Sequence, residues 1–263
     1  MKTIVITGST RGIGYGLANA FLARGCVVSV SGRSQDSVDV AVRQLAKRHP
    51  VEQIHGQACD VTQPDQVEAL WASAANHFGG VDIWINNAGI FQDYVKLWEV
   101  PDEQIHAVLE TNVIGTINGS RTAISHMLRQ GHGAIYNMEG FGSAGRVRPR
   151  MGIYAASKAA IRSFSKSLAV EAVDTPVIIG TLSPGMVVTD LLLDPVKDDP
   201  SALAQVKKIT NILGERVETI APWLADRILA NDTNGAEIAW LTRRKILWRF
   251  LTAAFHKRDL FGS

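Results

Sequence analysis

One pair of side chains in this sequence has the residue types and the spacing needed for proton transfer to a carbonyl oxygen. Tyr154 and Lys158 lie four residues apart in the segment Tyr-Ala-Ala-Ser-Lys-Ala-Ala. Residues i and i+4 share one face of a helix, so this spacing places the ammonium beside the phenol. A phenol has a pKa of about 10, and an adjacent cation favours its phenolate, which suits a proton donor to a carbonyl undergoing reduction. Taken alone, the pair also fits the exposed surface of an ordinary helix. Other segments of the sequence must show whether it is catalytic.

The N-terminal segment predicts a dinucleotide-binding turn. A short β-branched run, Thr3–Thr7, suits a buried strand, and the glycines at 8, 12 and 14 mark the turn into an apolar helix over Ile13–Phe21. Such glycines let the backbone approach a pyrophosphate closely, and the helix start offers free N–H groups and a positive dipole end. A lone glycine-rich turn would be weak evidence, but a strand before it and a helix after it support the interpretation.

Five motifs together resemble the short-chain dehydrogenase/reductase family in order and in spacing. They extend from residue 3 to about residue 190, and they are Thr7-Gly8-x-x-x-Gly12-Ile13-Gly14, Asn86-Asn87-Ala88-Gly89, Asn112 in Glu-Thr-Asn-Val-Ile-Gly, Tyr154-x-x-x-Lys158 and Ser183-Pro184-Gly185. The resemblance covers most of the chain and implies an oxidoreductase that uses a nicotinamide cofactor.

The alternation of strands and helices predicts one doubly wound α/β domain. Apolar strands are expected near residues 4–7, 27–31, 53–58, 83–86, 134–137, 177–182 and 238–241. Helices are expected near residues 14–24, 34–48, 64–78, 103–130, 154–173 and 219–229. Such alternation requires right-handed crossovers and a parallel sheet. We therefore expect a single Rossmann domain over residues 1–242, with a central parallel seven-stranded sheet, and a C-terminal helical extension over residues 243–263.

Composition argues against several other classes of protein. A chain of 263 residues with 46% hydrophobic and 20% charged residues suits one soluble globular domain. No apolar stretch reaches membrane-spanning length, and the first apolar run is a strand rather than a signal-peptide core. Cys26 and Cys59 have apolar surroundings, so two buried free thiols are expected, and the seven histidines form no cluster. We expect a cytoplasmic protein with no metal site and no nucleic-acid partner.

The residues after the second strand indicate which nicotinamide cofactor binds. An acidic residue there would hold the adenosine 2′-hydroxyl, whereas a basic residue accommodates a 2′-phosphate. Arg33 occupies this place, no carboxylate precedes Asp36, and Arg11 in the glycine-rich turn adds a second positive charge. Because a guanidinium binds phosphate through paired hydrogen bonds, we predict NADP(H). The alternative is that Arg33 is a solvated loop residue.

The resemblance implies further cofactor contacts at the carboxyl ends of the strands, where ligands bind in open α/β sheets. It places a carboxylate, Asp60, against the adenine amino group, and a turn after the sixth strand against the nicotinamide. The complete predicted cofactor set is Gly8, Ser9, Thr10, Arg11, Gly12, Ile13, Gly14, Arg33, Asp60, Val61, Asn87, Ala88, Gly89, Tyr154, Lys158, Pro184, Gly185, Val187 and Thr189.

The resemblance also implies a catalytic group. Tyr154 would be the general acid/base, Lys158 would lower the pKa of Tyr154 and bind the nicotinamide ribose, and Asn112 would position a water in the proton relay. The family usually adds a serine two or three residues after the asparagine of the preceding strand, but here those positions are Glu139 and Gly140. The nearest hydroxyl belongs to Ser143, which we predict to be the fourth catalytic residue in a remodelled loop. A site without a serine, or one in which Glu139 takes part, remains an alternative.

This departure, with two other segments, resembles the chlorophyll(ide) b reductases within the family. The segments are Asn-Met-acid-Gly-x-Gly-Ser at 137–143, Trp-Ile-Asn-Asn at 84–87 and Ser-Pro-Gly-Met-Val-x-Thr-x-Leu-Leu-Leu at 183–193. Those enzymes reduce a formyl group of a chlorin to a hydroxymethyl group with NADPH. The resemblance therefore implies NADPH-dependent reduction of a carbonyl or aldehyde on a bulky apolar substrate. Alternatives are an NADP-dependent reductase or dehydrogenase of the ketoacyl, steroid or sugar type, and a non-catalytic NADP-binding regulator.

Two segments beyond the minimal domain carry their own expectations. Residues 191–216 combine Leu191-Leu192-Leu193 with the breakers Asp194-Pro195, which suits a mobile cover over an apolar substrate or, equally, a static helix pair. Residues 243–263 predict a basic amphipathic helix. Its apolar stripe is Ile246, Leu247, Phe250, Leu251, Ala254 and Phe255, and its cations are Arg243, Arg244, Lys245, Arg249, Lys257 and Arg258. This helix could lie on an anionic membrane, pack on a partner subunit of a homo-oligomeric dimer or tetramer, or cover the pocket.

Overall fold

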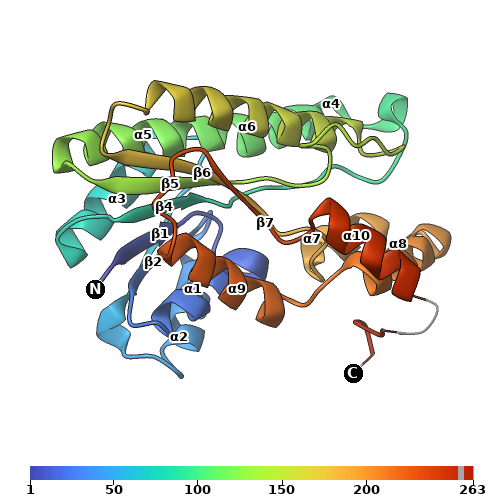
Figure 1. Ribbon diagram of the computed structural model, residues 1–263, viewed down its shortest axis with the longest axis horizontal. Helices are drawn as coiled ribbons and strands as arrows, with labels where there is room; N and C mark the ends of the chain where they lie inside the picture. Colours follow the sequence, from blue (N-terminus) through green and yellow to red (C-terminus); the bar gives the residue numbers. More distant parts are fainter. Residues whose placement is uncertain (254–257, 263) are drawn as a thin grey trace.

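Seven parallel strands form the centre of the molecule (Figure 1). The computed structural model describes residues 1–253 and 258–262. The strand order is β3-β2-β1-β4-β5-β6-β7, and every neighbouring pair is parallel. The strands are β1 Thr3–Ile6, β2 Val27–Gly32, β3 Ile54–Ala58, β4 Ile83–Asn86, β5 Gly133–Met138, β6 Val177–Ser183 and β7 Ala236–Ala239. The predicted single doubly wound domain with a seven-stranded parallel sheet is confirmed.

Helices cover both faces of this sheet (Figure 1). One hydrophobic cluster joins the sheet to α1 Gly12–Leu22, α2 Gln35–Leu45 and α9 Val217–Leu229. A second cluster joins the opposite face to α3 Pro64–Phe78, α5 Gly115–Gln130 and α6 Gly152–Glu171. Successive strand residues point to opposite faces, so Ile4 and Ile6 belong to the first cluster and Val5 to the second. Burial on both faces explains why the strands read as nearly continuous apolar runs.

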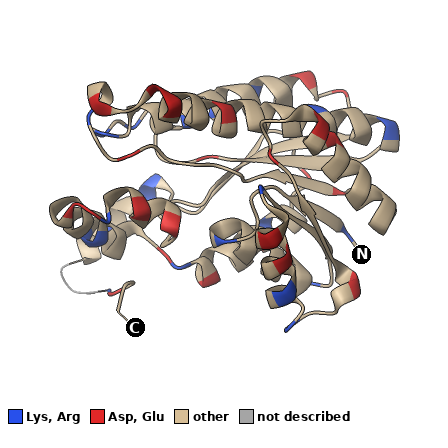
Figure 2. Cartoon of the chain, turned by 180° about the vertical axis from the view of Figure 1, so that it is seen from behind, with Lys and Arg blue, Asp and Glu red and all other residues tan. Residues whose placement is uncertain are grey.

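Charged side chains lie almost entirely outside the sheet, spread over helices and loops with both signs interspersed (Figure 2). Glu237 of β7 is the single Asp, Glu, Lys or Arg within the strands. Over the described ranges, no helix is both long and apolar enough to cross a membrane. Cys26 and Cys59 are buried free thiols, as expected.

The helix predicted over residues 103–130 is interrupted. The structure has α4 Asp102–Leu109, then a π-helical turn at Glu110–Ile114, then α5. Within the turn, the side chain of Asn112 binds the backbone of Ile90 instead of facing solvent, and the Thr116 hydroxyl donates to the Asn112 carbonyl. These tertiary contacts widen the helix locally, which the hydrophobic periodicity of the segment does not indicate.

The single C-terminal helix predicted over residues 243–263 is also wrong. Helix α10 spans Arg243–Thr252, and residues 258–262 form a turn. The backbone N–H of Leu260 donates to Asn211 at the end of α8 Pro200–Leu213, and the Asp259 carboxylate accepts from two later N–H groups. These contacts hold the terminal residues against the domain in a non-helical conformation. The predicted stripe residues Ala254 and Phe255 and the cation Lys257 lie outside the described residues.

The remaining elements are short. They are α7 Asp190–Leu193, immediately after the turn that follows β6, and 3₁₀ turns at Val51–Gln53, Leu97–Glu99 and Asp194–Val196. Helix α7, the turn that follows it and α8 together form most of the segment predicted to cover the substrate.

Candidate active site

The glycine-rich turn after β1 makes room for a ligand by close backbone packing. Gly8 and Gly12 adopt φ values of +61° and +58°, which favour glycine. A Cβ added at Gly8 would lie 2.8 Å from the Cα of Ala88, and one at Gly14 would lie 2.5 Å from Nδ2 of Asn87. Helix α1 starts at Gly12, so its free N–H groups face the same cavity. The turn therefore fits the pyrophosphate of a dinucleotide.

The end of β4 is fastened to this turn through side-chain hydrogen bonds. The Asn87 amide donates to the carbonyls of Thr7 and Gly8, at 2.9 Å in each case. The Thr7 hydroxyl accepts from the N–H groups of Asn87 and Ala88 at 3.0 and 3.1 Å. These bonds hold the ends of β1 and β4 together where they line the cavity.

The residues predicted to select the cofactor line the same cavity. Arg33 is exposed at the end of β2, beside Ser34 and Ser37, and Asp60 lies at the end of β3. Arg11 also lines the cavity, but its guanidinium lies 3.5 Å from the carboxylate of Asp190 in an exposed ion pair. Arg33 thus lines the cavity at the end of β2, whereas the guanidinium of Arg11 pairs with Asp190.

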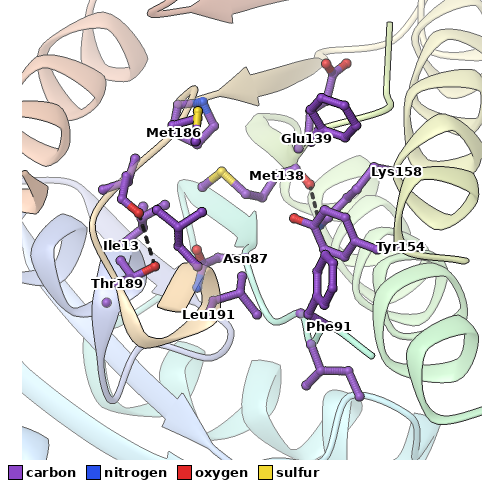
Figure 3. A pocket seen from close by; sticks show the side chains of 18 of the residues that line it. Ile13, Asn87, Phe91, Met138, Glu139, Tyr154, Lys158, Met186, Thr189 and Leu191 are labelled. Carbon is purple, nitrogen blue, oxygen red and sulfur yellow. Dashed lines mark hydrogen bonds between the residues drawn. The ribbon is translucent and has the colours of Figure 1, made fainter. Parts of the chain in front are cut away.

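Tyr154 and Lys158 lie side by side on α6 and face the cavity (Figure 3). The Lys158 ammonium donates to the Met138 carbonyl at 3.1 Å and lies 5.7 Å from the centroid of the Tyr154 ring. Burial raises the pKa of Tyr154 to about 12. Burial also lowers the pKa of Lys158 to about 8, against an opposing effect of the Glu139 charge. The role predicted for Lys158, to lower the pKa of Tyr154, stays a prediction, and its ammonium is directed to the Met138 carbonyl.

The π-helical turn places Asn112 behind this pair. Its side-chain oxygen accepts from Ile90 N–H at 2.8 Å, and its amide donates to the Ile90 carbonyl and to the Ser157 hydroxyl, at 3.0 Å in each case. Asn112 is fully buried and does not itself line the cavity. It connects the loop after β4 to α6 and so fixes the helix that carries Tyr154.

The loop after β5 brings Ser143 to the cavity, where its hydroxyl group is hydrogen-bonded to another side chain of the same loop. The Ser143 hydroxyl donates to the carboxylate of Glu139 at 3.0 Å. Gly140 packs against the tyrosine, since a Cβ there would lie 2.6 Å from the Tyr154 hydroxyl oxygen. The structure thus brings Ser143 and Glu139, the two alternatives left open by the sequence, together as one hydrogen-bonded unit.

Apolar side chains form the outer wall of the cavity, which has a volume of about 900 Å³. Phe91 lies beside Tyr154, with ring centroids 4.7 Å apart, and Leu191 lies on the opposite side (Figure 3). Further apolar lining comes from α7, α8 and the turn after β6, through Met186, Leu192, Val196, Val206, Ile209 and Leu213. Several residues of the segment 191–216 therefore line the apolar side of the cavity.

Most residues proposed from the sequence meet at this cavity, with two exceptions. Ser9 is fully buried under the glycine-rich turn, where its hydroxyl donates to Ile6 and accepts from Ser31 N–H, and Asn112 is the residue behind the tyrosine. Sequence reasoning did not single out Phe91 or Arg162. Arg162 had a usable signal, because it follows Tyr154 and Lys158 at the next interval of four residues on α6. Within the described ranges, no three His, Cys, Asp or Glu side chains gather as a metal site.

The sequence is similar to those of known proteins. A family model described as short chain dehydrogenase matches residues 2–199. The chain is 37% identical over 278 residues to "Probable chlorophyll(ide) b reductase NYC1, chloroplastic" of Arabidopsis thaliana, covering 100% of this chain and 55% of that protein. It is 39% identical over 238 residues to "Chlorophyll(ide) b reductase NOL, chloroplastic" of the same plant, covering 89% and 67%. The chain thus spans about half the length of the first relative and two thirds of the second.

Solved structures share the fold. Levodione reductase superposes with a TM-score of 0.83 at 22% identity, covering 93% of this chain and 97% of that one. The structure "ElxO with NADP Bound" has a TM-score of 0.79 at 26% identity, covering 90% and 96%. The first likeness shows the fold alone, and the second concerns a protein with a bound nicotinamide cofactor.

Proposed function

Because the chain belongs to the short-chain dehydrogenase/reductase family, we propose that it is an NADPH-dependent reductase of a carbonyl or aldehyde group on a bulky apolar substrate. The observation that carries this proposal is the buried Tyr154–Lys158 pair, which lines the cavity on the side opposite the glycine-rich turn. The names of the two plant relatives support a substrate of the chlorophyll(ide) b type.

The residues of the glycine-rich turn and of the strand ends would hold the cofactor. Gly8, Gly12 and Gly14 leave space for a pyrophosphate at the N-terminus of α1, and Arg33 would bind a 2′-phosphate. When bound, the cofactor supplies a hydride to the carbonyl carbon. The turn after β6, with Thr189, lies on the opposite side of the cavity from Tyr154 (Figure 3), which suits a contact with the nicotinamide end.

Tyr154 supplies the proton in this proposal. Its hydroxyl faces the cavity, and a pKa of about 12 keeps it protonated at neutral pH, so it can donate to the oxygen of a carbonyl as negative charge develops there. Lys158, one helical turn away, is the nearest group to replace that proton. Asn112 would hold α6 in place from behind, and Ser143, whose hydroxyl donates to Glu139, would lie beside the carbonyl oxygen.

The apolar wall favours a large apolar substrate over a small polar one. Phe91, Leu191, Leu192 and Met186 extend from the tyrosine along the cavity, so the reactive carbonyl can lie at Tyr154 while an apolar body contacts the cover. A ketoacyl, steroid or sugar carbonyl is the second candidate, since the same proton-transfer groups would serve it.

A substrate screen tests the proposal. Purified protein is mixed with NADPH, and oxidation is followed by absorbance over a panel that includes chlorophyllide b, steroid ketones, ketoacyl thioesters and sugars. Oxidation with the chlorin aldehyde and formation of the hydroxymethyl product are the expected outcome. Faster NADPH oxidation with another member of the panel would assign that compound class as the substrate instead of the chlorin. NADPH binding without NADPH oxidation in the presence of any member would favour a regulator that does not turn over.

We also propose that the protein assembles with copies of itself. Val170 of α6, Val173 just after it and Leu128 of α5 are 74%, 66% and 45% exposed, and these side chains would pack on a partner subunit. Light scattering at micromolar concentration distinguishes a dimer or tetramer from a monomer.

A further inference from the structure

Glu139 is a buried carboxylate on the loop that also carries Ser143. It follows directly after β5, and its side chain is only 1% exposed. The Ser143 hydroxyl donates to Oε2 of Glu139 at 3.0 Å, and Nη1 of Arg162 donates to both carboxylate oxygens at 3.2 and 2.9 Å. A buried charge is costly unless it is paired and hydrogen-bonded, and here both conditions are met.

Arg162 connects this carboxylate to the last strand of the sheet. Its two terminal nitrogens donate to the two carboxylate oxygens of Glu237 on β7, at 2.7 and 2.5 Å. Arg162 follows Tyr154 and Lys158 at intervals of four, so one face of α6 carries all three side chains. The guanidinium thereby fixes the position of Glu139 relative to the proton-transfer pair.

The segment Met138–Glu139–Gly140 contacts Lys158, Ser143 and Tyr154. The Met138 carbonyl accepts from the Lys158 ammonium, Glu139 accepts from Ser143, and Gly140 packs against the Tyr154 hydroxyl. The titratable groups that act on the ammonium are Tyr154 on its own helix and Glu139 after β5, and Arg162 pairs with Glu139 and with Glu237 of β7. The negative charge of Glu139 opposes the lowering of the Lys158 pKa by burial.

We propose that Glu139 is a positioning residue that holds the Ser143 hydroxyl at the cavity wall and keeps the buried ammonium of Lys158 protonated. Arg162 and Glu237 keep the carboxylate in place for both tasks. This inference rests on the proposed function, because it gives Lys158 and Ser143 roles in carbonyl reduction.

The first experiment measures NADPH affinity by fluorescence titration between pH 6 and pH 10, and then turnover over the same range with the best substrate. Removal of an opposite charge at close range shifts a pKa by roughly one unit or more. In Glu139→Gln, the alkaline fall of affinity and of turnover should therefore move to lower pH by about one unit. Glu139→Asp, which retains the charge, should keep the profile of the native protein. Glu171→Gln, at the exposed end of α6, is the matched control and should also leave it unchanged.

The proposal would be overturned if the alkaline fall of NADPH affinity and turnover (the alkaline limb) stayed at the same pH in a folded Glu139→Gln protein. An equal shift of this limb in Glu171→Gln would overturn it too. If Glu139→Gln does not fold, Arg162→Gln provides the second test, since loss of the neutralising guanidinium should move the limb to higher pH. A limb that does not move upward in that variant counts against the proposal in the same way.

Two further comparisons separate this inference from its premises. The cofactor titration needs no substrate, so a shifted affinity profile in a protein that reduces none of the carbonyls would contradict only the proposed function. Ser143→Ala tests the contact with the serine. If Glu139 acts on turnover through Ser143, the loss in the double variant should be smaller than the product of the two single losses. Strictly multiplicative losses would overturn that part of the proposal.

Discussion

A Cβ atom at position 140 would lie 2.6 Å from the hydroxyl oxygen of Tyr154, so Gly140 packs directly against the proton donor. The backbone after β5 and helix α6 leave no space between them for a larger side chain. Any larger side chain at this position would displace the tyrosine. The nearest hydroxyl on this loop belongs to Ser143, three residues further along.

Replacement of Gly140 by alanine should lower turnover at least tenfold while the protein remains folded, because the added methyl group pushes Tyr154 out of position. Gly152→Ala is the matched control, since nothing lies within 4 Å of a Cβ at that position. Steady-state rates and melting temperatures of the two variants test this expectation. Normal turnover in Gly140→Ala would show that the loop moves away at little cost.

Tyr154→Phe should lower turnover by roughly 10²–10⁴-fold, the usual contribution of general acid catalysis, because only the proton donor is lost. NADPH affinity should remain within a few-fold of the native value. Tyr15→Phe, whose ring lies outside the cavity, serves as the control. Rates close to normal in Tyr154→Phe would contradict the proposed proton transfer.

Arg33→Ala should weaken NADPH binding by roughly ten- to a hundredfold and leave NADH binding nearly unchanged, since a charge-assisted bond to the 2′-phosphate is lost. Arg33→Asp should weaken NADPH further by repulsion. The exposed Arg43 of α2, which does not line the cavity, provides the control variant Arg43→Ala. Fluorescence titrations with both cofactors measure the effect, and equal affinities in the native protein would contradict the selection of NADP(H).

The pH dependence of carbonyl reduction should follow Lys158. Burial lowers the pKa of its ammonium from the ordinary value of 10.5 to about 8, so the group is charged below about pH 8 and neutral above it. Because a protonated Lys158 is needed to restore the proton of Tyr154, turnover should be constant on the acid side and fall as pH rises through about 8. A rate that stays level to pH 10 would show that another group supplies the proton.

Helix α10 should bring the protein to anionic membranes. Leu247, Trp248 and Leu251 are 62%, 67% and 64% exposed, and the helix begins with Arg243 and Arg244. Its other face is held by Arg249, which donates to the Leu213 and Gly214 carbonyls and pairs with Glu215. The stripe residues Leu247, Phe250 and Leu251 therefore point outward, away from the domain, where they can enter a lipid interface.

Co-sedimentation with phosphatidylserine-containing vesicles at low salt measures this binding. Leu247→Asp/Leu251→Asp should abolish it, whereas Val51→Asp, at an exposed apolar position outside α10, should not. If the native protein stays in the supernatant, and the α10 variant instead changes the mass of the assembly, the stripe is a subunit interface.

The amino-acid sequence by itself determined the architecture and the proton-transfer pair. Strand periodicity and turn glycines act over a few residues, so the alternation that builds the sheet and the turn at Gly8 could be recognised without tertiary contacts. Tyr154 and Lys158 could also be recognised without tertiary contacts, because their spacing on a helix fixes their relative position.

Only the tertiary structure decided which groups surround that pair. Arg162 binds Glu139, 23 residues before it, and Glu237, 75 residues after it, and no local pattern encodes contacts over such separations. The π-helical turn at Asn112 and the placement of Leu260 likewise depend on partners from other elements, Ile90 for the first and Asn211 for the second. Burial, which raises the pKa of Tyr154 and lowers that of Lys158, exists only once the chain has enclosed them.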